Sequence, residues 1–388
     1  MKTPQEENLR RQLNEIRGAD QSAVRAAQAY VQSLAAPPGS LGKLAEAAVQ
    51  LAGITGRQRN TLGRRRIIVM CADNGVTAEG VSSAPQSVTL AQAVNMTKHV
   101  TGMSSMAAYF GDQVEVVDVG IAAPFDEGSV KILPRKIRCG TGNIAKEPAL
   151  TRGQALEAIL VGISRAGQAA ADGVDVIGVG EMGIGNTTTS SAVLAALTGL
   201  PVEAVTGRGG GLTDAAFEKK KEVIARALAL HGLNAAVPQT DTAGSAQGPD
   251  AEFPDPIDVI AKVGGLDIAA MCGVFLGAAV YRIPAVVDGF ISIVAALCAK
   301  RICGEVRDFL FPSHVSEEIG FMRAAQELGL EPWLHMNMRL GEGSGCPLAF
   351  RILEAACALM NRMATFEKAQ IDDGYLEEIR GTQRADRG

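Results

Sequence analysis

Short runs of β-branched residues alternate with longer alanine-rich stretches through most of this 388-residue chain. The runs are predicted to be buried strands, and the apolar residues between them recur at helical spacing. The predicted strands are 67–70, 114–117, 174–177, 284–287 and, with a weaker pattern, 309–311. The predicted helices are 89–109, 152–171, 187–198, 215–231, 267–280, 290–302 and 314–329. Because such alternation produces a parallel sheet covered on both faces, we expect an α/β fold: an open, mostly parallel, Rossmann-like sheet flanked by helices.

The two ends of the chain show helical patterns without strands between them. Residues 1–35 and 41–52 have apolar residues at helical spacing, separated by Pro37-Pro38-Gly39, and residues 349–363 form another apolar helical stretch. We therefore expect two domains. A large α/β catalytic domain would span 60–348, and a small helical domain would combine 1–59 with 349–388.

Composition excludes several classes of protein. The net charge of −5 and the aromatic content of 4% argue against a nucleic-acid partner. The polar N-terminal residues do not resemble a signal peptide, and no apolar run is long enough for a membrane span. The 7 cysteines and 4 histidines are scattered without metal-ligand spacing, so we expect reduced thiols, a cytoplasmic location and no protein-bound metal.

Polar or glycine-rich segments follow all five predicted strands. These segments are 72–75, 118–120, 180–183, 288–290 and 312–314. In open α/β sheets, ligands bind at the carboxyl ends of the strands. The sequence therefore predicts a binding site at this edge.

The segment 178–188 contains a Gly-x-Gly-x-x-Gly pattern between a predicted strand and a helix. Asn186 and Thr187 would leave free amides for an anion at the helix start. The pattern also fits a tight turn without a ligand. A dinucleotide site is a weaker alternative, because Glu181 would repel a pyrophosphate, and Glu203, the acid roughly 20 residues further on, follows Pro201 at a predicted helix start.

Three further segments contain candidate site residues. Residues 207–214, followed by three lysines at 219–221, suit a phosphate loop, although they also fit a flexible loop with solvated lysines. In 339–346, glycines flank Glu342, as expected for a general base beside a ligand, or for a helix start. In 313–318, Ser316 could bind phosphate and His314 is more simply structural. No Gly-x-Ser-x-Gly occurs, which disfavours acyl transfer.

Taken in order, these motifs resemble the nicotinate-nucleotide:dimethylbenzimidazole phosphoribosyltransferase family, which assembles the lower ligand of cobamides. The likeness extends from Pro37 to Ala355. The segments that match are 37–44, 72–76, 79–82, 140–144, 180–188, 207–209, 263–265, 288–290, 313–314 and 339–345.

The resemblance implies a ribosyl transfer. An aromatic base attacks C1′ of nicotinate mononucleotide, nicotinate leaves, and C1′ inverts to give α-ribazole 5′-phosphate. The general base of the family matches Glu342, and a second carboxylate near the ribose matches Glu181. The family needs no cofactor, has a parallel α/β sheet with a small helical lobe, and usually forms a homodimer.

The remaining site residues follow from the motifs and the resemblance together. The expected phosphate- and ribose-binding residues are Gly183, Asn186, Thr187, Gly207, Arg208, Gly209, Lys220 and Ser316. The expected base-binding residues are Ala84, Gln92, Met182 and Leu340.

The chain departs from the family pattern at three places. Asn74 replaces the usual histidine, Ala84 replaces a hydroxyl or aromatic residue, and the loop 238–256 is longer than usual. The acceptor base is therefore left open among benzimidazoles, purines and phenols. Two alternatives to a self-sufficient enzyme also stay open: a catalytically silent or heterodimeric subunit of such an enzyme, and a less favoured NAD-dependent oxidoreductase.

Overall fold

The computed structural model describes residues 3–126, 128, 130–233 and 254–376. Most of the predicted loop 238–256, up to residue 253, lies outside the described residues, and so does the C-terminal tail.

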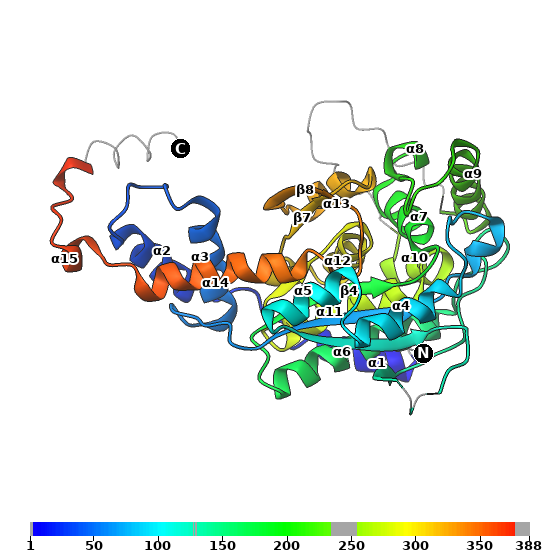
Figure 1. Cartoon of the computed structure of the whole chain (residues 1–388), viewed down its shortest axis with the longest axis horizontal. Coiled ribbons are helices and arrows are strands. Elements are labelled where there is room, and N and C mark those ends of the chain that lie inside the picture. The colour runs from blue at the N-terminus through cyan, green and yellow to red at the C-terminus, as the bar shows by residue number, and fades with distance from the viewer. Residues whose placement is uncertain (1–2, 127, 129, 234–253, 377–388) are drawn as a thin grey trace.

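A six-stranded parallel sheet forms the centre of the large unit (Figure 1). Its strands are β1 (Arg65–Ala72), β2 (Gln113–Gly120), β3 (Ile132–Pro134), β4 (Val176–Met182), β5 (Ala285–Val287) and β6 (Leu310–Phe311). They are arranged in the order β3-β2-β1-β4-β5-β6, which is the doubly wound order of Rossmann folds. The open parallel sheet expected from the sequence is confirmed, with all five predicted strands in it. The sixth, β3, was missed because it has only three residues and ends in a proline.

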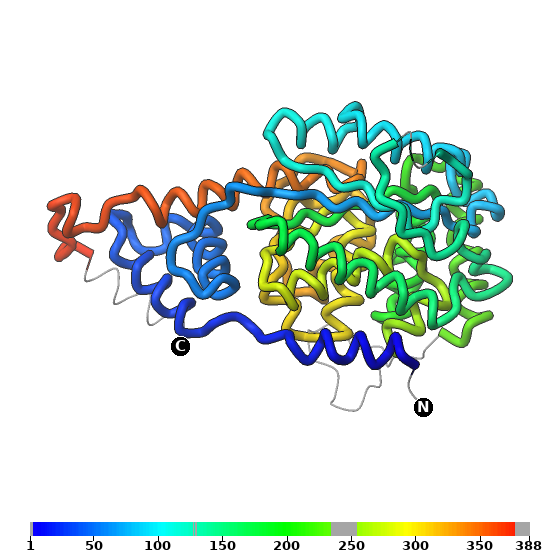
Figure 2. The backbone as a smooth tube through the Cα atoms, turned by 90° about the horizontal axis from the view of Figure 1, so that it is seen from below, coloured from blue at the N-terminus to red at the C-terminus, as the bar shows by residue number. Residues whose placement is uncertain are grey.

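Helices cover both faces of this sheet, as Figures 1 and 2 show. On one face, α4 (Val88–Thr97), α5 (Gly102–Phe110) and α14 (Cys346–Arg362) pack against the strands. On the other face lie α6 (Arg152–Ala171), α11 (Leu266–Val280) and α12 (Phe290–Ile302). The remaining helices near the sheet are α7 (Asn186–Thr198), α8 (Val202–Val205), α9 (Asp214–Leu230), α10 (Pro256–Val263) and α13 (Gly320–Leu328), with the 3₁₀ turns η1 (Gly75–Glu79) and η2 (Gly304–Phe309).

Two predicted helices differ from the observed ones. The single helix expected over 89–109 is split into α4 and α5, because the Thr101 hydroxyl caps a new helix by accepting the Ser104 amide, and the Thr101 amide donates in return to Ser104 Oγ. The helix expected over 314–329 begins only at Gly320. Its first residues instead form β7 (His314–Ser316), which pairs in parallel with β8 (Leu334–Met338) in a separate two-stranded sheet.

Helices α6 and α11 pack so closely that glycine is required at their contact. A Cβ added at Gly162 would lie 2.0 Å from the Ala270 carbonyl oxygen, and one at Gly273 would lie 2.0 Å from that of Ile159. These contacts are backbone contacts, so no side-chain rotation can relieve them. The pair forms a closely packed layer under the sheet, in which α11 is buried from Leu266 to Ala279 and α6 has an exposed outer side.

A small helical lobe lies beside the sheet and contains α2 (Gln21–Ser33), α3 (Gly42–Thr55) and the distal part of α14 (Figure 1). The chain continues through α15 (Phe366–Ala369) and η3 (Gly374–Leu376). Helix α1 (Pro4–Leu13), in contrast, packs against α6 and α11 of the large unit (Figure 2). The division into 60–348 and 1–59 plus 349–388 stays a proposal, and α1 is the element that fits it least.

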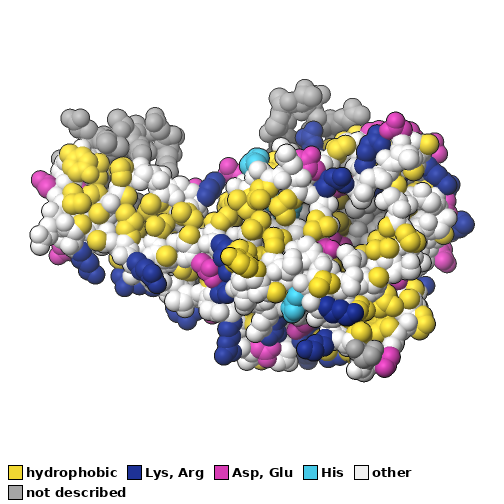
Figure 3. Space-filling model, viewed as in Figure 1, with side chains coloured by type: hydrophobic (Ala, Val, Ile, Leu, Met, Phe, Trp, Pro, Cys, Tyr) yellow, Lys and Arg dark blue, Asp and Glu magenta, His cyan; other side chains and the backbone are white. Residues whose placement is uncertain are grey.

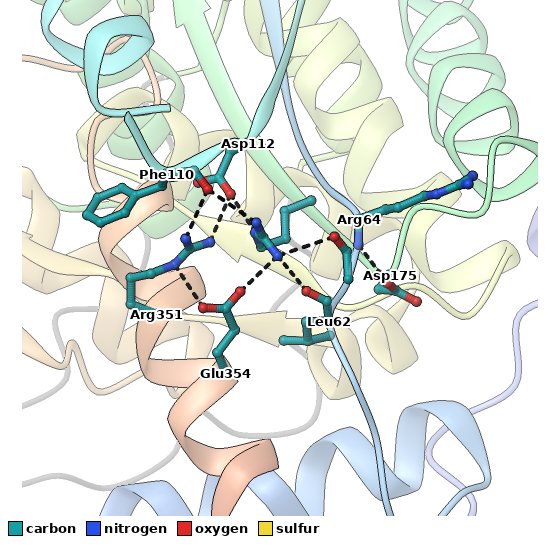
Figure 4. Close-up of polar contacts among 9 residues, drawn as sticks. Leu62, Arg64, Phe110, Asp112, Asp175, Arg351 and Glu354 are labelled. Carbon is teal, nitrogen blue, oxygen red and sulfur yellow. Dashed lines mark hydrogen bonds and ion pairs between the residues drawn. The ribbon is translucent and has the colours of Figure 1, made fainter. Parts of the chain in front are cut away.

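A buried charge network ties α14 to α5 and β1 (Figure 4). The Asp112 carboxylate, whose side chain is fully buried, accepts bonds from Arg65 Nε at 2.5 Å and Arg351 Nη2 at 2.8 Å. Glu354 bridges the same two guanidiniums, at 2.8 Å and 3.1 Å. Arg351 also lies 4.9 Å from the centroid of the Phe110 ring. The network therefore fixes α14 against the end of α5.

Candidate active site

A cavity of ≈ 240 Å³ opens at the carboxyl edge of the sheet, beside the ends of β1 and β4. The strand order reverses between these two strands, and such a switch point is where open α/β sheets bind ligands. Segments from α4, the start of α7, the 208–212 loop, the start of α12, β7 and the 339–342 turn form its wall.

The structure brings nearly all of the predicted site residues together around this cavity. Those that line it are Ala84, Gln92, Glu181, Met182, Gly183, Asn186, Thr187, Arg208, Gly209, Ser316, Leu340 and Glu342. Gly207 and Lys220 do not line the cavity and lie behind its wall. Their assigned roles remain predictions, since position alone does not test a role.

Glu342 sits in an unusual turn between β8 and α14. Gly341, Glu342 and Gly343 all have left-handed backbone, with φ of 78°, 63° and 88°. This conformation is disfavoured for a residue with a Cβ. The buried Asp288 carboxylate holds the turn by accepting bonds from the amides of Gly343, at 3.0 Å, and Gly345, at 2.6 Å. The strained backbone is therefore fixed from the end of β5.

The Glu342 side chain is only 4% exposed, and its two oxygens have different partners. Gln92 Nε2 donates to Oε1 at 3.4 Å, and the Met103 amide at the start of α5 donates to Oε2 at 3.2 Å. These donors orient the carboxylate while Glu342 lines the cavity. The arrangement suits a group that accepts a proton from a bound ligand.

Glu181, at the end of β4, is linked directly to the turn that carries Glu342. Its Oε1 accepts the Glu342 amide at 3.2 Å, and its Oε2 accepts a bond from the Asn186 side chain. Burial, reinforced by the nearby Asp267 charge, raises the pKa of Glu181 to about 8. In the absence of a cation, this carboxyl group is therefore largely protonated at neutral pH.

Asp267, in the first turn of α11, is a component of the site that sequence reasoning missed. It is fully buried, and burial raises its pKa to about 6, although Asn186 and Asn74 oppose that shift. A Cβ at Gly183 would lie 2.6 Å from Asp267 Oδ2 and 3.1 Å from Asn74 Nδ2. Asn74, the position that departs from the family pattern, thus belongs to the layer directly beneath Gly183.

Lys220 does not line the cavity but contacts residues that form its wall. Its Nζ donates to Thr187 Oγ1 at 2.9 Å and to the Gly207 carbonyl oxygen at 2.8 Å, and its side chain is fully buried. Burial lowers the pKa of Lys220 to about 8, against the opposing effect of Glu318. Lys220 therefore supports the loop at Gly207 and polarises the Thr187 hydroxyl, which does line the cavity.

The polar part of the wall combines cations with the N-terminal end of a helix. Arg339 Nη1 donates to the Gly209 carbonyl oxygen at 3.1 Å, and Arg208 Nη2 pairs with Asp214 at 2.6 Å. Helix α7 begins at Asn186 without a side-chain cap, and its first residues line the cavity. The free Asn186 amide expected from the sequence is not observed, because this amide donates to the Gly183 carbonyl oxygen at 3.1 Å and the Thr188 amide donates to that of Gly185 at 3.0 Å. The dipole of the helix still favours an anion such as phosphate at this end.

The remaining wall is largely apolar. Ala84, Met182 and Leu340 lie there together with Val88 and other aliphatic side chains. Leu340 is 54% exposed and lies against Gly102 at the start of α5. Gln92 and Glu342 are the polar side chains beside this apolar surface.

Three buried acidic residues at or beside the cavity were not predicted from the sequence as site residues: Asp267, Asp288 and Glu318. Asp288 and Glu318 lie in segments that the sequence singled out, so their signal was present but unspecific. Asp267 falls inside a predicted helix and gave no signal at all. Glu203, the acid required for the dinucleotide alternative, is exposed in α8 and does not line the cavity.

Among the described residues, no group of three or more His, Cys, Asp or Glu side chains is placed to hold a metal ion. All seven cysteines are free thiols. Within the same part of the chain, no helix combines the length and apolar character needed to cross a membrane.

The doubly wound sheet and the carboxylate- and amide-lined cavity at its switch point define the class of α/β enzymes that act on anionic, nucleotide-like substrates. A family model described as phosphoribosyltransferase matches residues 16–371. The chain belongs to the nicotinate-nucleotide–dimethylbenzimidazole phosphoribosyltransferase family, as the resemblance in the sequence implied.

Named relatives agree over nearly the whole chain. The nicotinate-nucleotide–dimethylbenzimidazole phosphoribosyltransferase of Clostridium perfringens is 50% identical over 95% of this chain and 96% of its own. That of Clostridium tetani is 44% identical over 97% of each chain. The crystal structure of CobT from Thermus thermophilus superposes with a TM-score of 0.82 at 37% identity, covering 91% of this chain and 100% of that one. The oxidoreductase alternative finds no support in these relatives.

Proposed function

We propose that this chain transfers the 5-phosphoribosyl group of nicotinate mononucleotide to an aromatic lower-ligand base. C1′ inverts from β to α, and the products are nicotinate and an α-ribazole 5′-phosphate for the nucleotide loop of a cobamide. The observation that carries the proposal is the hydrogen bond between two of the carboxylate residues that line the cavity, from the Glu342 amide to Glu181 Oε1. The names of the relatives support the same reaction.

Glu342 is proposed as the general base. As a ring nitrogen or the phenol oxygen of the acceptor attacks C1′, the acceptor gives its N–H or O–H proton to a Glu342 carboxylate oxygen. The bond from C1′ to the nicotinate nitrogen breaks, and its electron pair neutralises the pyridinium ring. Gln92 and the Met103 amide hold the carboxylate ready for this proton.

Glu181 is proposed to respond to the charge of the substrate. Its pKa of about 8 in the free site means that the carboxyl group is held protonated by burial and by Asp267. A pyridinium ring, and then a ribose with oxocarbenium character, favours the ionised form when it binds beside this group. Glu181 thus supplies negative charge at the stage when positive charge develops on the sugar.

The phosphate is proposed to bind at the polar wall. The α7 amides near Gly183 and Asn186, the hydroxyls of Thr187 and Ser316, and the loop at 207–209 are the expected contacts, with Lys220 acting behind Thr187. The acceptor base would occupy the apolar wall formed by Ala84, Met182 and Leu340, beside Gln92.

The finer points of assembly and location are proposals as well. We infer a homodimer and a cytoplasmic location, with no nucleic-acid or membrane partner and no cofactor. The free cysteines are consistent with a reducing compartment. Figure 3 shows apolar side chains that extend from the small lobe along α14 towards α5, a surface suited to a second copy.

A nicotinate-release assay tests the function. The purified chain is mixed with nicotinate mononucleotide and, separately, with 5,6-dimethylbenzimidazole, adenine or p-cresol. Release that depends on an acceptor supports the proposal and names the acceptor class. Binding of the mononucleotide without release in any mixture would instead favour the silent or heterodimeric subunit.

A further inference from the structure

Asp288 does not line the cavity, yet both of its side-chain oxygens bind the turn that carries Glu342. It follows β5, and it is only 2% exposed. Its Oδ2 accepts the Gly343 amide at 3.0 Å, and its Oδ1 accepts the Gly345 amide at 2.6 Å. Asparagine has the same size but an acceptor at only one end of its side-chain amide. Only a carboxylate of this length can therefore satisfy both amides.

The turn lies directly on the backbone of β4. A Cβ at Gly180 would lie 2.5 Å from the Glu342 carbonyl oxygen, and one at Gly343 would lie 3.2 Å from Gly180 Cα. Further along the turn, a Cβ at Gly345 would collide with the Ser313 hydroxyl and the neighbouring imidazole ring. Close packing on several sides therefore leaves the turn little room, and Asp288 sets its position within that room.

Asp288 is itself held in place. Its amide donates to Ser292 Oγ at 3.2 Å, and the Ser292 hydroxyl donates to the Val179 carbonyl oxygen of β4 at 3.0 Å. The fully buried His314 places its Nδ1 3.8 Å from Asp288 Oδ1. Burial raises the pKa of Asp288, and His314 and three backbone amides oppose that shift. The carboxylate is thus fixed between β4, the start of α12 and the turn.

We propose that Asp288 is a positioning residue, which through Gly343 and Gly345 keeps the Glu342 carboxylate where it can take the proton of the acceptor base. The inference rests on the proposed function, because it takes Glu342 as the general base. The left-handed backbone of the turn costs free energy, and the two bonds from Asp288 offset part of it. Without one of them the turn relaxes, and a shift of about 1 Å in a catalytic group can slow a reaction roughly 100-fold.

A double-mutant cycle separates positioning from a general effect on the fold. In Asp288→Asn, one of the two amides faces an NH₂ group. We expect kcat for nicotinate release with 5,6-dimethylbenzimidazole to fall about 10- to 100-fold, and KM for the mononucleotide to change less than about threefold. In the Glu342→Gln background, the same substitution should change kcat less than about threefold, because no carboxylate remains to be positioned. Radiolabelled nicotinate makes this slow turnover measurable.

Two results of the cycle would overturn the proposal. Equal fold-losses of kcat in both backgrounds would show that Asp288 acts independently of Glu342. A raised KM with unchanged kcat would assign its effect to substrate binding.

Asp118→Asn is the matched control. Asp118 is also fully buried and accepts two amides at the end of a strand, those of Gly120 at 3.0 Å and Ile121 at 2.8 Å. It does not line the cavity or bind the Glu342 turn. Its variant should keep kcat within about threefold of wild type, as expected away from a reacting group. A loss as large as that of Asp288→Asn would contradict a specific role for Asp288.

A second variant covers the case in which Asp288→Asn fails to fold, which circular dichroism and a thermal melt would show. Ser292→Ala removes only the hydroxyl that accepts the Asp288 amide. We expect a loss in kcat of about 3- to 10-fold, the range for one hydrogen bond, that disappears in the Glu342→Gln background. An equal loss in both backgrounds would overturn the proposal.

Failure of this inference is distinguishable from failure of the proposed function. Acceptor-dependent nicotinate release by wild type, and its loss in Glu342→Gln, test the function with Asp288 unchanged. An additive cycle beside those two results would reject the positioning role and leave the proposed reaction standing.

Discussion

Glu342 combines a strained backbone with a side chain that faces the proposed substrate. Replacing it with glutamine tests the carboxylate separately from the backbone. Glu342→Gln keeps the size of the side chain and the bond from Gln92 or Met103 to the amide oxygen, but it removes the proton acceptor. We expect kcat for nicotinate release to fall about 10²- to 10⁴-fold, the usual range for general-base catalysis. The melting temperature should change little, and near-normal turnover would contradict the base assignment.

The raised pKa of Glu181 predicts a pH-dependent stability. Between its ordinary value of 4.5 and about 8, the unfolded chain releases this proton while the folded chain retains it. The free energy of unfolding of the ligand-free enzyme therefore falls as the pH rises through this range. Glu181→Gln cannot titrate, so its stability relative to wild type should increase by on the order of 3 kcal/mol from pH 5 to pH 8.

Urea unfolding of wild type and Glu181→Gln at pH 5, 6, 7 and 8 measures this difference. A gap that stays constant across the four pH values would show that Glu181 titrates near its ordinary value in the folded chain. Glu317→Gln, which alters an exposed carboxylate, should give a nearly constant gap and serves as the control.

At the residue scale, the sequence was most informative where glycine and charge occur together. Glu342 between glycines and Glu181 at a strand end were identified because such patterns are uncommon. The position of Lys220 behind Thr187 was not predictable, because spacing along a helix does not reveal what lies between a side chain and a cavity. Asp267 was hidden because an acid in the first turn of a helix is ordinary.

At the element scale, the joint between α5 and α14 predicts a stability effect. Asp112→Asn removes the charge that pairs with Arg65 and Arg351 in a buried network. We expect the free energy of unfolding to fall by about 3 kcal/mol, since two guanidiniums lose their main counter-charge. Glu354→Gln alters a side chain that is 34% exposed, and should cost less than about 1 kcal/mol.

Chemical denaturation of both variants checks this ordering. If the Asp112 and Glu354 variants lose equal free energy of unfolding, the network acts as a surface ion-pair cluster. The buried carboxylate would then contribute no more to stability than the partly exposed one.

The contact of α6 with α11 gives a second prediction at this scale. Gly273→Ala would place a Cβ 2.0 Å from the Ile159 carbonyl oxygen, so the two helices would have to separate. We expect a loss of at least about 2 kcal/mol, as for overpacked cores. Gly304→Ala is the matched control, because a Cβ there has no neighbour within 4 Å, and thermal unfolding of the two variants measures the difference.

Helix and strand patterns in the sequence located most elements but not all of their boundaries. The split between α4 and α5 depends on Thr101 and Ser104 bonding reciprocally, a local interaction that apolar periodicity does not reveal. Strand β7 was read as part of a helix because its three residues are too few for a period to appear.

At the scale of the whole molecule, the proposed homodimer is directly measurable. Two large apolar side chains at opposite ends of α5 are exposed: Val100, just before the helix, is 67% exposed, and Tyr109, in its last turn, is 85% exposed. We expect sedimentation equilibrium to give a mass of twice 40.4 kDa. Tyr109→Lys should weaken the dimer, whereas a monomer in the wild-type protein at micromolar concentration would contradict the proposal.

The overall architecture was predictable because strand and helix patterns alternate along the chain, and few chain topologies are compatible with such alternation. The placement of α1 was not, because an amphipathic helix at a terminus can dock on any apolar surface within reach. Its contacts with α6 and α11 come from the three-dimensional surface of the large unit.

The left-handed backbone at Glu342 has a consequence for descendants of this chain. Glycine at that position would relieve the strain, so selection for stability alone favours the loss of the carboxylate. Glutamate therefore persists there only while its reaction is useful to the cell. A homologue with the same turn but glycine or asparagine in place of this glutamate would be a chain that has lost the catalytic activity while its fold has become more stable.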